Sequence, residues 1–205
     1  MKKIVSIFLF LIVIAGGIGF GVNATNNLKG KQEVLPASSK QTIKKQAPAP
    51  VVKEVVKPGV PQKIRIPKIG VDATVESVGL DAEKKMEVPK GADNAGWYSL
   101  GARPGEKGNA VLDGHLDKKD GSAAVFFKVA SLKSGDKIII TDDKGKDYTF
   151  AVTSTTEYPY DNFPLQKVFG PTSDAMLNLI SCKGTWNEET HNYSHRTVVY
   201  SQLTN

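Results

Sequence analysis

Cysteine is nearly absent from this 205-residue chain, which contains a single one, Cys182. One cysteine excludes a disulfide within the chain and a zinc site built from several thiolates. The three histidines, His115, His191 and His195, do not form the HExxH pattern of a helix-borne zinc site. The acidic residues are scattered and form no EF-hand loop. We therefore expect neither a metal nor another cofactor.

The part of the chain that is expected to fold lacks an excess of positive charge. Residues 1–58 contain nine Lys and two acidic residues, a net charge of +7, whereas the remainder contains 18 basic and 19 acidic residues, a net charge of −1. A nucleic-acid-binding domain carries its basic surplus on the folded part. The sequence therefore predicts no nucleic-acid partner.

Residues 4–22 form a long apolar run that is interrupted only by Ser6 and by glycines, and Lys2 and Lys3 precede it. The run is close to the roughly 20 residues that cross a membrane, and flanking lysines stay on the cytoplasmic side. We interpret residues 1–24 as a single-pass signal anchor that holds the rest of the chain outside the cell membrane. The alternative is a cleaved signal peptide, because Val22, Asn23 and Ala24 offer a cleavage site. Both alternatives export the domain.

Two further segments follow the apolar run. Residues 25–60 are rich in Lys, Gln, Ala, Pro and Val without a helical or strand period, which is typical of a disordered spacer. From residue 61 to 205, short runs of Val, Ile, Tyr and Phe alternate with Gly, Asp and Pro, which predicts one mainly β domain, either a sandwich or a closed barrel. Strands are predicted at residues 63–66, 73–78, 110–115, 137–141, 148–157, 176–182 and 197–202, and short helices at 124–132 and 162–169.

Cys182 is a candidate nucleophile because an unpaired cysteine in an exported protein is either a buried small residue or a reactive thiol. It follows the apolar run LNLIS and precedes a Lys-Gly pair, so we expect it at the end of a strand. A thiol also needs a proton partner at neutral pH. His115, at the end of the run NAVLDGH, is the leading candidate, whereas His191 and His195 lie in a segment that reads as a polar loop.

Arg196 is the candidate for stabilising negative charge on a reacting carbonyl oxygen, because its guanidinium stays protonated and presents several donors. It precedes the apolar run TVVY, 14 residues after Cys182. Alternation along a strand sends Arg196 and His195 to opposite faces, and we expect Arg196 to face Cys182. A surface arginine at a strand edge is the alternative reading.

Three segments, NAVLDGH, LNLISC and HRTVVYSQL, resemble the signature segments of the sortase family over residues 63–203, and residues 96–115, 122–136 and 162–172 are most similar to class F sortases. The resemblance implies a closed eight-stranded sortase-type β-barrel and a cysteine transpeptidase, which also acts as a thiol protease when water is the acceptor. It implies that His115, Cys182 and Arg196 are catalytic. Two positions depart from the family pattern, since Ser181 replaces the usual Thr and Asp113 replaces a small apolar residue.

The resemblance also implies the partners. The enzyme would cleave an LPxTG-like sorting signal of exported proteins through a thioacyl intermediate and would transfer the acyl group to an amine of a peptidoglycan precursor, on the surface of a Gram-positive bacterium. Ser181 and the apolar loop 158–174 are expected to bind the signal, the loop through Tyr160, Phe163, Leu165 and Val168.

Two alternatives belong to other classes of protein. An L,D-transpeptidase is also an exported Cys/His enzyme, but its His and Cys lie close together in sequence, whereas His115 and Cys182 are 67 residues apart. A non-enzymatic wall-binding domain on a membrane stalk would need none of the three aligned residues, and its thiol would be inert.

Overall fold

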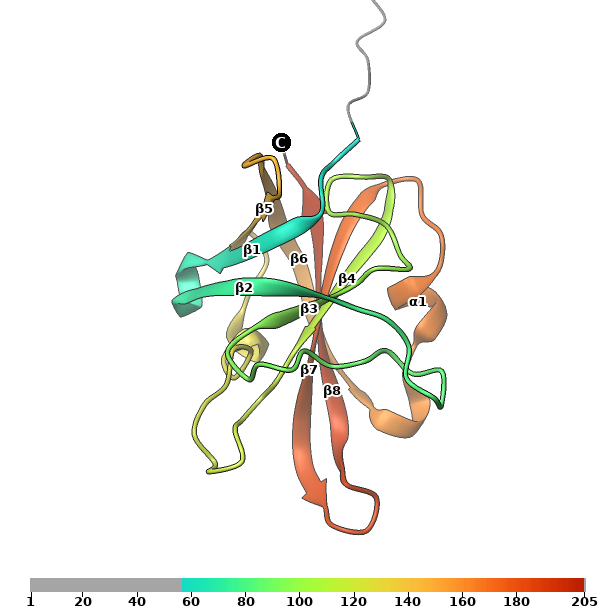
Figure 1. The fold of residues 1–205 in the computed structure, drawn as a ribbon. Helices are drawn as coiled ribbons and strands as arrows, with labels where there is room; N and C mark the ends of the chain where they lie inside the picture. Colours follow the sequence, from blue (N-terminus) through green and yellow to red (C-terminus); the bar gives the residue numbers. More distant parts are fainter. Residues whose placement is uncertain (1–56, 205) are drawn as a thin grey trace, which may run out of the picture. The chain divides into compact units, whose positions relative to one another are not determined.

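The computed structural model describes residues 57–204, which form one closed barrel of eight strands (Figure 1). The strands are β1 (Pro61–Ile66), β2 (Val71–Val78), β3 (Ala95–Tyr98), β4 (Gly108–Gly114), β5 (Lys137–Asp142), β6 (Asp147–Pro159), β7 (Ala175–Asn187) and β8 (Asn192–Leu203). The helical elements are the α-helix α1 (Leu165–Phe169) and three 3-10 turns, η1 (Pro67–Ile69), η2 (Val129–Ser131) and η3 (Tyr160–Asn162). The predicted mainly β fold with a closed eight-stranded barrel is confirmed.

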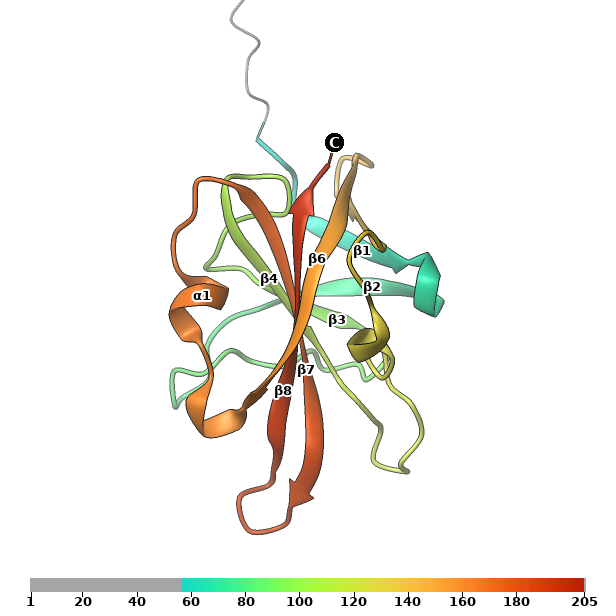
Figure 2. The same cartoon turned by 180° about the vertical axis from the view of Figure 1, so that it is seen from behind.

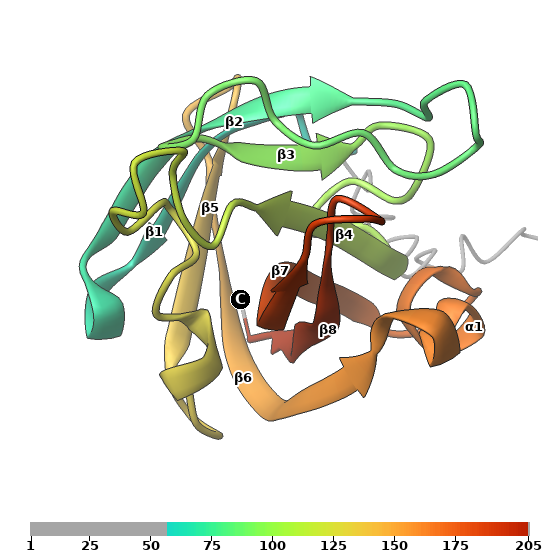
Figure 3. The ribbon, with the colours of Figure 1, turned by 90° about the horizontal axis from the view of Figure 1, so that it is seen from below.

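The strands pair in the order β1-β2-β3-β4-β7-β8-β6-β5, and β5 pairs with β1 to close the sheet (Figure 3). All pairs are antiparallel except β2–β3 and β4–β7. The sequence prediction missed β3, whose four residues Ala-Gly-Trp-Tyr are too few to show an alternating pattern. β7 continues to Asn187, and β8 begins at Asn192. The segment that the sequence analysis interprets as a polar loop is therefore part of a hairpin that projects beyond the barrel (Figure 2).

The barrel interior is filled by inward-facing apolar side chains. Fully buried examples are Ile64 and Ile66 from β1, Leu112 from β4, Phe150 from β6 and Leu179 from β7. The alternation of buried and outward residues along β1 and β5 follows the period of two that a half-buried strand requires.

The helix predicted over residues 124–132 is wrong, because this segment forms turns followed by η2. Its hydrogen bonds join residues three apart, as from Val129 N–H to the Phe126 carbonyl and from Leu132 N–H to the Val129 carbonyl. The side chains of Phe126, Val129 and Leu132 are all buried. This spacing of three matches a 3-10 turn, which brings residues i and i+3 to one side, better than it matches an α-helix.

Outward-facing residues of β4, β7 and β8 are buried as well, and we call this surface the covered face. Val111, Val198 and Tyr200 form a second apolar cluster with Val168 of α1, against which Phe163, Phe169 and Ile180 pack. The segment 158–170, which contains η3 and α1, therefore lies over the covered face, with α1 beside β4 (Figures 1 and 2).

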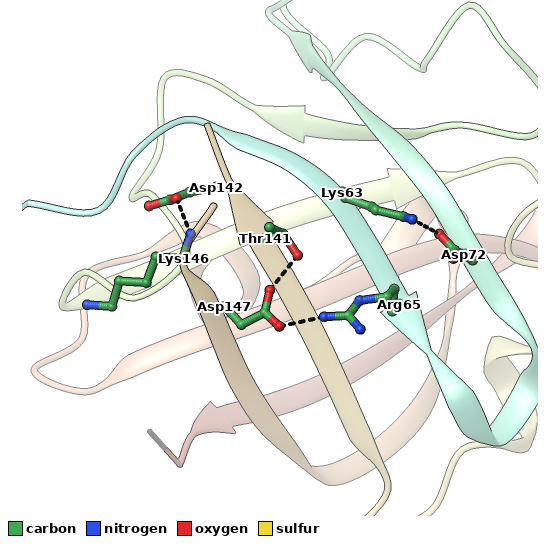
Figure 4. Close-up of polar contacts among 7 residues, drawn as sticks. All are labelled: Lys63, Arg65, Asp72, Thr141, Asp142, Lys146 and Asp147. Carbon is green, nitrogen blue, oxygen red and sulfur yellow. Dashed lines mark hydrogen bonds and ion pairs between the residues drawn. The ribbon is translucent and has the colours of Figure 1, made fainter. Parts of the chain in front are cut away.

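Most outward residues of β1, β2, β5 and β6 are polar, and we call this surface the polar face. Figure 4 shows Lys63 paired with Asp72 at 2.7 Å, and Asp147 between Arg65 at 2.5 Å and the Thr141 hydroxyl at 2.6 Å. The side chains of these ion pairs are between 37% and 59% exposed.

The beginning of the described chain is attached to the turn between β5 and β6. Gly59 N–H donates to the Asp142 carboxylate at 2.9 Å, and Asp142 also accepts from the N–H of Lys146 (Figure 4). This attachment and the end of β8 lie at the end of the barrel opposite to the β7–β8 turn (Figure 1). No helix within residues 57–204 is long and apolar enough to cross a membrane. The predicted anchor 1–24 and most of the predicted spacer 25–60 lie outside the described residues.

Candidate active site

The register of β4, β7 and β8 brings the three predicted catalytic residues together. Gly114, the last residue of β4, lies opposite Ser181 in the parallel β4–β7 pair, and Cys182 lies opposite Arg196 in the β7–β8 pair. His115 follows Gly114 directly, so the backbone of His115 continues beside Cys182. Three segments far apart in sequence thus meet at one end of the covered face.

Strand alternation places Cys182 and Arg196 on the same face. Ile180, two residues before Cys182, and Val198, two residues after Arg196, both belong to the second apolar cluster. His195 takes the other side of β8, where its Nδ1 lies 2.9 Å from the Ser194 hydroxyl. The expected opposite orientation of Arg196 and His195 is therefore present.

The sequence predicts Cys182 at the end of a strand, but the structure places it within β7. The strand continues to Asn187 after an irregularity in pairing between Lys183 and Trp186, where Gly184 adopts a φ of +88°. A bulge next to a reactive group bends the strand and redirects its side chains. The local break that the Lys-Gly pair predicts is thus a bulge inside a longer hairpin.

The Cys182 thiol is partly buried, and its burial raises its pKa. The positive charge of Arg196 opposes this effect, whereas the carboxyl groups of Asp117 and Asp113 raise the pKa further. The resting group is therefore a thiol, and a proton acceptor is needed to form the thiolate.

His115 is half-buried and is oriented by a backbone carbonyl. Its Nε2 lies 2.9 Å from the carbonyl oxygen of Pro89. A carbonyl oxygen only accepts hydrogen bonds, so the proton of the neutral ring is on Nε2 and the free lone pair is on Nδ1. Pro89, which the sequence analysis missed, therefore selects Nδ1 as the nitrogen that can exchange a proton.

Arg196 is held by the hairpin and by the segment that follows β6. Its Nη1 donates to the carbonyl oxygens of Tyr193 at 3.2 Å and His195 at 2.9 Å, and its Nη2 donates to the side-chain oxygen of Asn192 at 2.5 Å. The ring of Tyr160 lies 4.7 Å from the guanidinium carbon. These contacts fix a cation beside Cys182.

Ser181 lies on the opposite face of β7 from Cys182. It is buried, and its hydroxyl donates to the carbonyl oxygen of Gly114 at 3.2 Å. The sequence analysis expects Ser181 to contact the substrate, but its side chain points into the barrel. Its contact ties the end of β4 to β7, directly before His115 and Cys182.

Of the loop residues that are predicted to bind the peptide, two pack against the barrel and two are exposed to solvent. Val168 is fully buried, and Phe163 packs on the second cluster with its ring 6.3 Å from that of Tyr158. Tyr160 is 38% exposed and Leu165 is 66% exposed, so these two can be reached from solvent.

Asn178 of β7, which the sequence analysis missed, holds this loop against the barrel. Its side-chain amide donates to the Val168 carbonyl at 2.8 Å and to the Asn109 side chain at 2.9 Å. A polar residue inside the apolar run LNLIS was the available signal, because a buried amide in a strand needs partners.

Asp113 is buried on the covered face, two residues before His115. One of its carboxyl oxygens has no hydrogen-bond partner within residues 57–204. Burial raises the pKa of Asp113 well above its usual range, a backbone hydrogen bond and the charge of Arg196 oppose this effect, and the charge of Glu76 adds to it. Asp113 is therefore a buried carboxyl group on the outer side of the barrel.

Within residues 57–204, no group of three or more His, Cys, Asp or Glu side chains could hold a metal ion. The arrangement offers a thiol, a proton acceptor and a fixed cation, which are the groups that acyl transfer through a thioester requires.

Comparisons with known proteins give the family. The family model described as Sortase domain matches residues 64–204, more than half of the chain, so the chain belongs to the sortase family. Sortase A of Bacillus anthracis is 35% identical over 77 residues, which cover 38% of this chain and 35% of that relative. The chain thus matches about a third of the length of this curated relative.

Solved structures share the fold at low sequence identity. Sortase A from Corynebacterium diphtheriae aligns with a TM-score of 0.53 and 21% identity, covering 73% of this chain and 62% of that chain. Sortase C-1 from Actinomyces oris aligns at 0.55 with 20% identity over 70% and 71% of the two chains. Sortase A from Listeria monocytogenes aligns at 0.54 with 24% identity over 72% and 88%. The similarity to class F remains a prediction.

Proposed function

We propose that this chain is a cysteine transpeptidase that cleaves an LPxTG-like sorting signal after its Thr and transfers the acyl group to an amine of a peptidoglycan precursor. The observation that supports this function is the β4–β7–β8 register, in which Gly114, the residue before His115, pairs with Ser181, and Cys182 pairs with Arg196. Membership of the sortase family supports the same reaction.

The first half of the reaction forms the thioacyl enzyme. Cys182 gives its proton to Nδ1 of His115, and the thiolate attacks the Thr carbonyl carbon. Arg196 donates hydrogen bonds to the resulting oxyanion. The carbonyl re-forms, the C–N bond breaks, and Nδ1–H protonates the leaving amine. The Pro89 carbonyl, which accepts from Nε2, stabilises the positive charge on the ring during this step.

The second half transfers the acyl group. The incoming amine attacks the thioester carbon and gives a proton to Nδ1 of neutral His115. Arg196 again holds the oxyanion, the C–S bond breaks, and the departing thiolate regains its proton from the imidazolium. Water in place of the amine gives hydrolysis by the same steps.

Peptide binding is assigned to the end of the covered face beside Cys182 and to the exposed side chains of the segment 158–170. Val198, two residues after Arg196, is fully buried, whereas Ile180, two residues before Cys182, is only partly buried. Ile180 and the exposed Tyr160 and Leu165 therefore offer apolar surface to a peptide. Such a surface suits an extended apolar Leu-Pro pair better than a charged ligand.

The test uses the full chain in detergent, a peptide library around LPxTG and triglycine as the amine. Mass spectrometry should show cleavage after Thr and a Thr–Gly₃ product. It should also show a trapped adduct on Cys182 when the amine is omitted at low temperature. A chain that leaves the library intact while its thiol does not react with iodoacetamide would be a wall-binding module.

We further propose that residues 4–22 anchor the enzyme in the cell membrane with the barrel outside. The apolar run and the preceding lysines support this location. The full chain should stay in the membrane fraction after carbonate extraction, and externally added protease should reach the barrel in intact cells. Release of the barrel into the medium would instead favour a cleaved signal peptide.

A further inference from the structure

The guanidinium of Arg196 is fixed without an acidic partner. None of the ion pairs formed by residues 57–204 includes Arg196. Its hydrogen bonds go to two backbone carbonyls and to Asn192, all from its own strand. The ring of Tyr160, which lies 4.7 Å from the guanidinium carbon, is the contact that comes from another segment.

The donor count shows what these contacts leave free. A guanidinium has five N–H groups, of which Arg196 uses two on Nη1 and one on Nη2 within the described chain. The Nε–H and one Nη2–H remain for a ligand. Because an arginine side chain has many rotamers, these donors are useful for catalysis only if the plane of the group is held.

Tyr160 is well placed to hold that plane. Tyr158 of β6 lies directly opposite Arg196 of β8, and Tyr160 follows two residues later as the first residue of η3. Its ring is 38% exposed, so it contacts the cation while remaining accessible from solvent. Tyr160 also begins the segment that continues through Phe163 to α1 over the covered face.

We infer that Tyr160 is a positioning residue whose ring holds the Arg196 guanidinium in the orientation that binds the oxyanion, and that it couples the peptide-binding segment to the acyl-transfer step. This inference rests on the proposed function. It gives Tyr160 a different role from the direct substrate contact that the sequence analysis expects. The ring restricts Arg196, and it belongs to the same segment, 158–170, to which peptide binding is assigned.

The test separates the ring from the hydroxyl. Tyr160→Leu removes the aromatic face, and Tyr160→Phe keeps it. A cation–π contact contributes about 0.7–2 kcal/mol, which corresponds to about threefold to thirtyfold in rate. We expect Tyr160→Leu to lower kcat for peptide transfer by this factor with KM changed less than twofold, and Tyr160→Phe to stay within twofold of wild type in both constants.

Two controls accompany these variants. Phe127→Leu removes another exposed ring, which is 49% exposed and lies outside the site, and should leave both constants unchanged. In the Arg196→Lys background, Tyr160→Leu should cost less than twofold, because the planar group on which the ring stacks is gone. An equal cost in both backgrounds would overturn the inference.

A measurement without substrate separates this inference from the proposed function. In ¹⁵N-labelled protein, the Nε–H resonance of Arg196 should be shifted by the ring current in wild type and Tyr160→Phe, and should lose that shift in Tyr160→Leu. Absence of the shift in wild type overturns the inference whatever the activity. A rise in KM alone in Tyr160→Leu overturns it too, in favour of direct substrate contact. A wild-type chain that transfers no peptide but shows the shift refutes the proposed function, and the stacking still stands.

Discussion

The polar face and the covered face belong to the same closed sheet, yet their strands are built differently. On β1, buried Ile64 and Ile66 alternate with outward Lys63 and Arg65, whose charges pair in solvent. On β4, Val111 and Leu112 are adjacent and both fully buried. A strand that is buried on both sides needs something to cover its outer side, and segment 158–170 covers β4, β7 and β8. The comparison shows that the two-sided apolar strands are those that carry the candidate catalytic residues.

The strongest test of this comparison removes the reactive group of the covered face and keeps its packing. Cys182→Ala should lower peptide cleavage and transfer by at least about 10³-fold, because no other thiol is present in the chain. Thermal unfolding should be almost unchanged. Ser181→Ala, one residue away but inside the barrel, is the matched control. It should keep its activity and lose about 0.5–1.5 kcal/mol of stability with the hydrogen bond to Gly114. The reverse pattern would show that the faces of β7 are assigned the wrong way round.

The second test compares two neighbours on β8. Arg196→Ala should lower kcat by about 10²–10³-fold, the cost of losing an oxyanion donor, and Arg196→Lys should remain well below wild type because it loses the fork geometry. His195→Ala should change kcat by less than about threefold, since its side chain takes the other side of β8, where it lies against the Ser194 hydroxyl. A dead His195→Ala variant beside a normal Arg196→Ala variant would contradict the register drawn here.

The third test concerns Asp113, a carboxyl group on the covered face. Burial raises its pKa in the folded state, so the folded protein holds this proton at pH values where the unfolded chain has lost it. The contribution of Asp113 to wild-type stability should therefore fall as pH rises above the ordinary Asp range of about 4, by about 1.4 kcal/mol for each pH unit until the raised pKa is reached. Asp113→Asn removes this loss. Its gain in Tm over wild type should be larger at pH 8 than at pH 4, and an equal gain at both would show that Asp113 is not buried.

The smallest effect is expected on the polar face. Arg65→Ala breaks the pair with Asp147, but both side chains are more than a third exposed. Such pairs contribute about 0–1 kcal/mol, and less at high salt. Denaturant unfolding should shift by less than about 1 kcal/mol, with kcat and KM unchanged. A larger loss would mean that the polar face supports the barrel in a way that exposed ion pairs do not explain.

The sequence predicted those features that depend on local patterns. Apolar runs located seven of the eight strands, and the family resemblance supplied the closure of the barrel. The features that it missed depend on contacts between distant segments. The short strand β3 exists because Ala95 and Trp97 fill the barrel between β2 and β4. Likewise, the contact of Pro89 with His115 and that of Tyr160 with Arg196 join segments whose proximity only the folded barrel reveals.

Asp113 of β4 and Ser181 of β7 show the same limit for single positions within predicted strands. The prediction identified both as departures from the family pattern. Which face each side chain takes depends on the register of β4 against β7, and a shift of one residue would exchange the two faces. The sequence alone therefore marks the positions without assigning their environment.

Closure of the barrel also limits how a peptide can be gripped. Along the covered face, β4 pairs with β3 and β7, β7 with β4 and β8, and β8 with β7 and β6. As far as the Gly114–Ser181 and Pro159–His195 pairs, β7 and β8 therefore have a partner strand on both sides and no open edge. A peptide that joins an open sheet edge is held by main-chain bonds that are nearly blind to its side chains. That mode is closed along this face. A peptide lying there must be held by its own side chains and by loop atoms, which favours discrimination between sequences at the expense of tight binding.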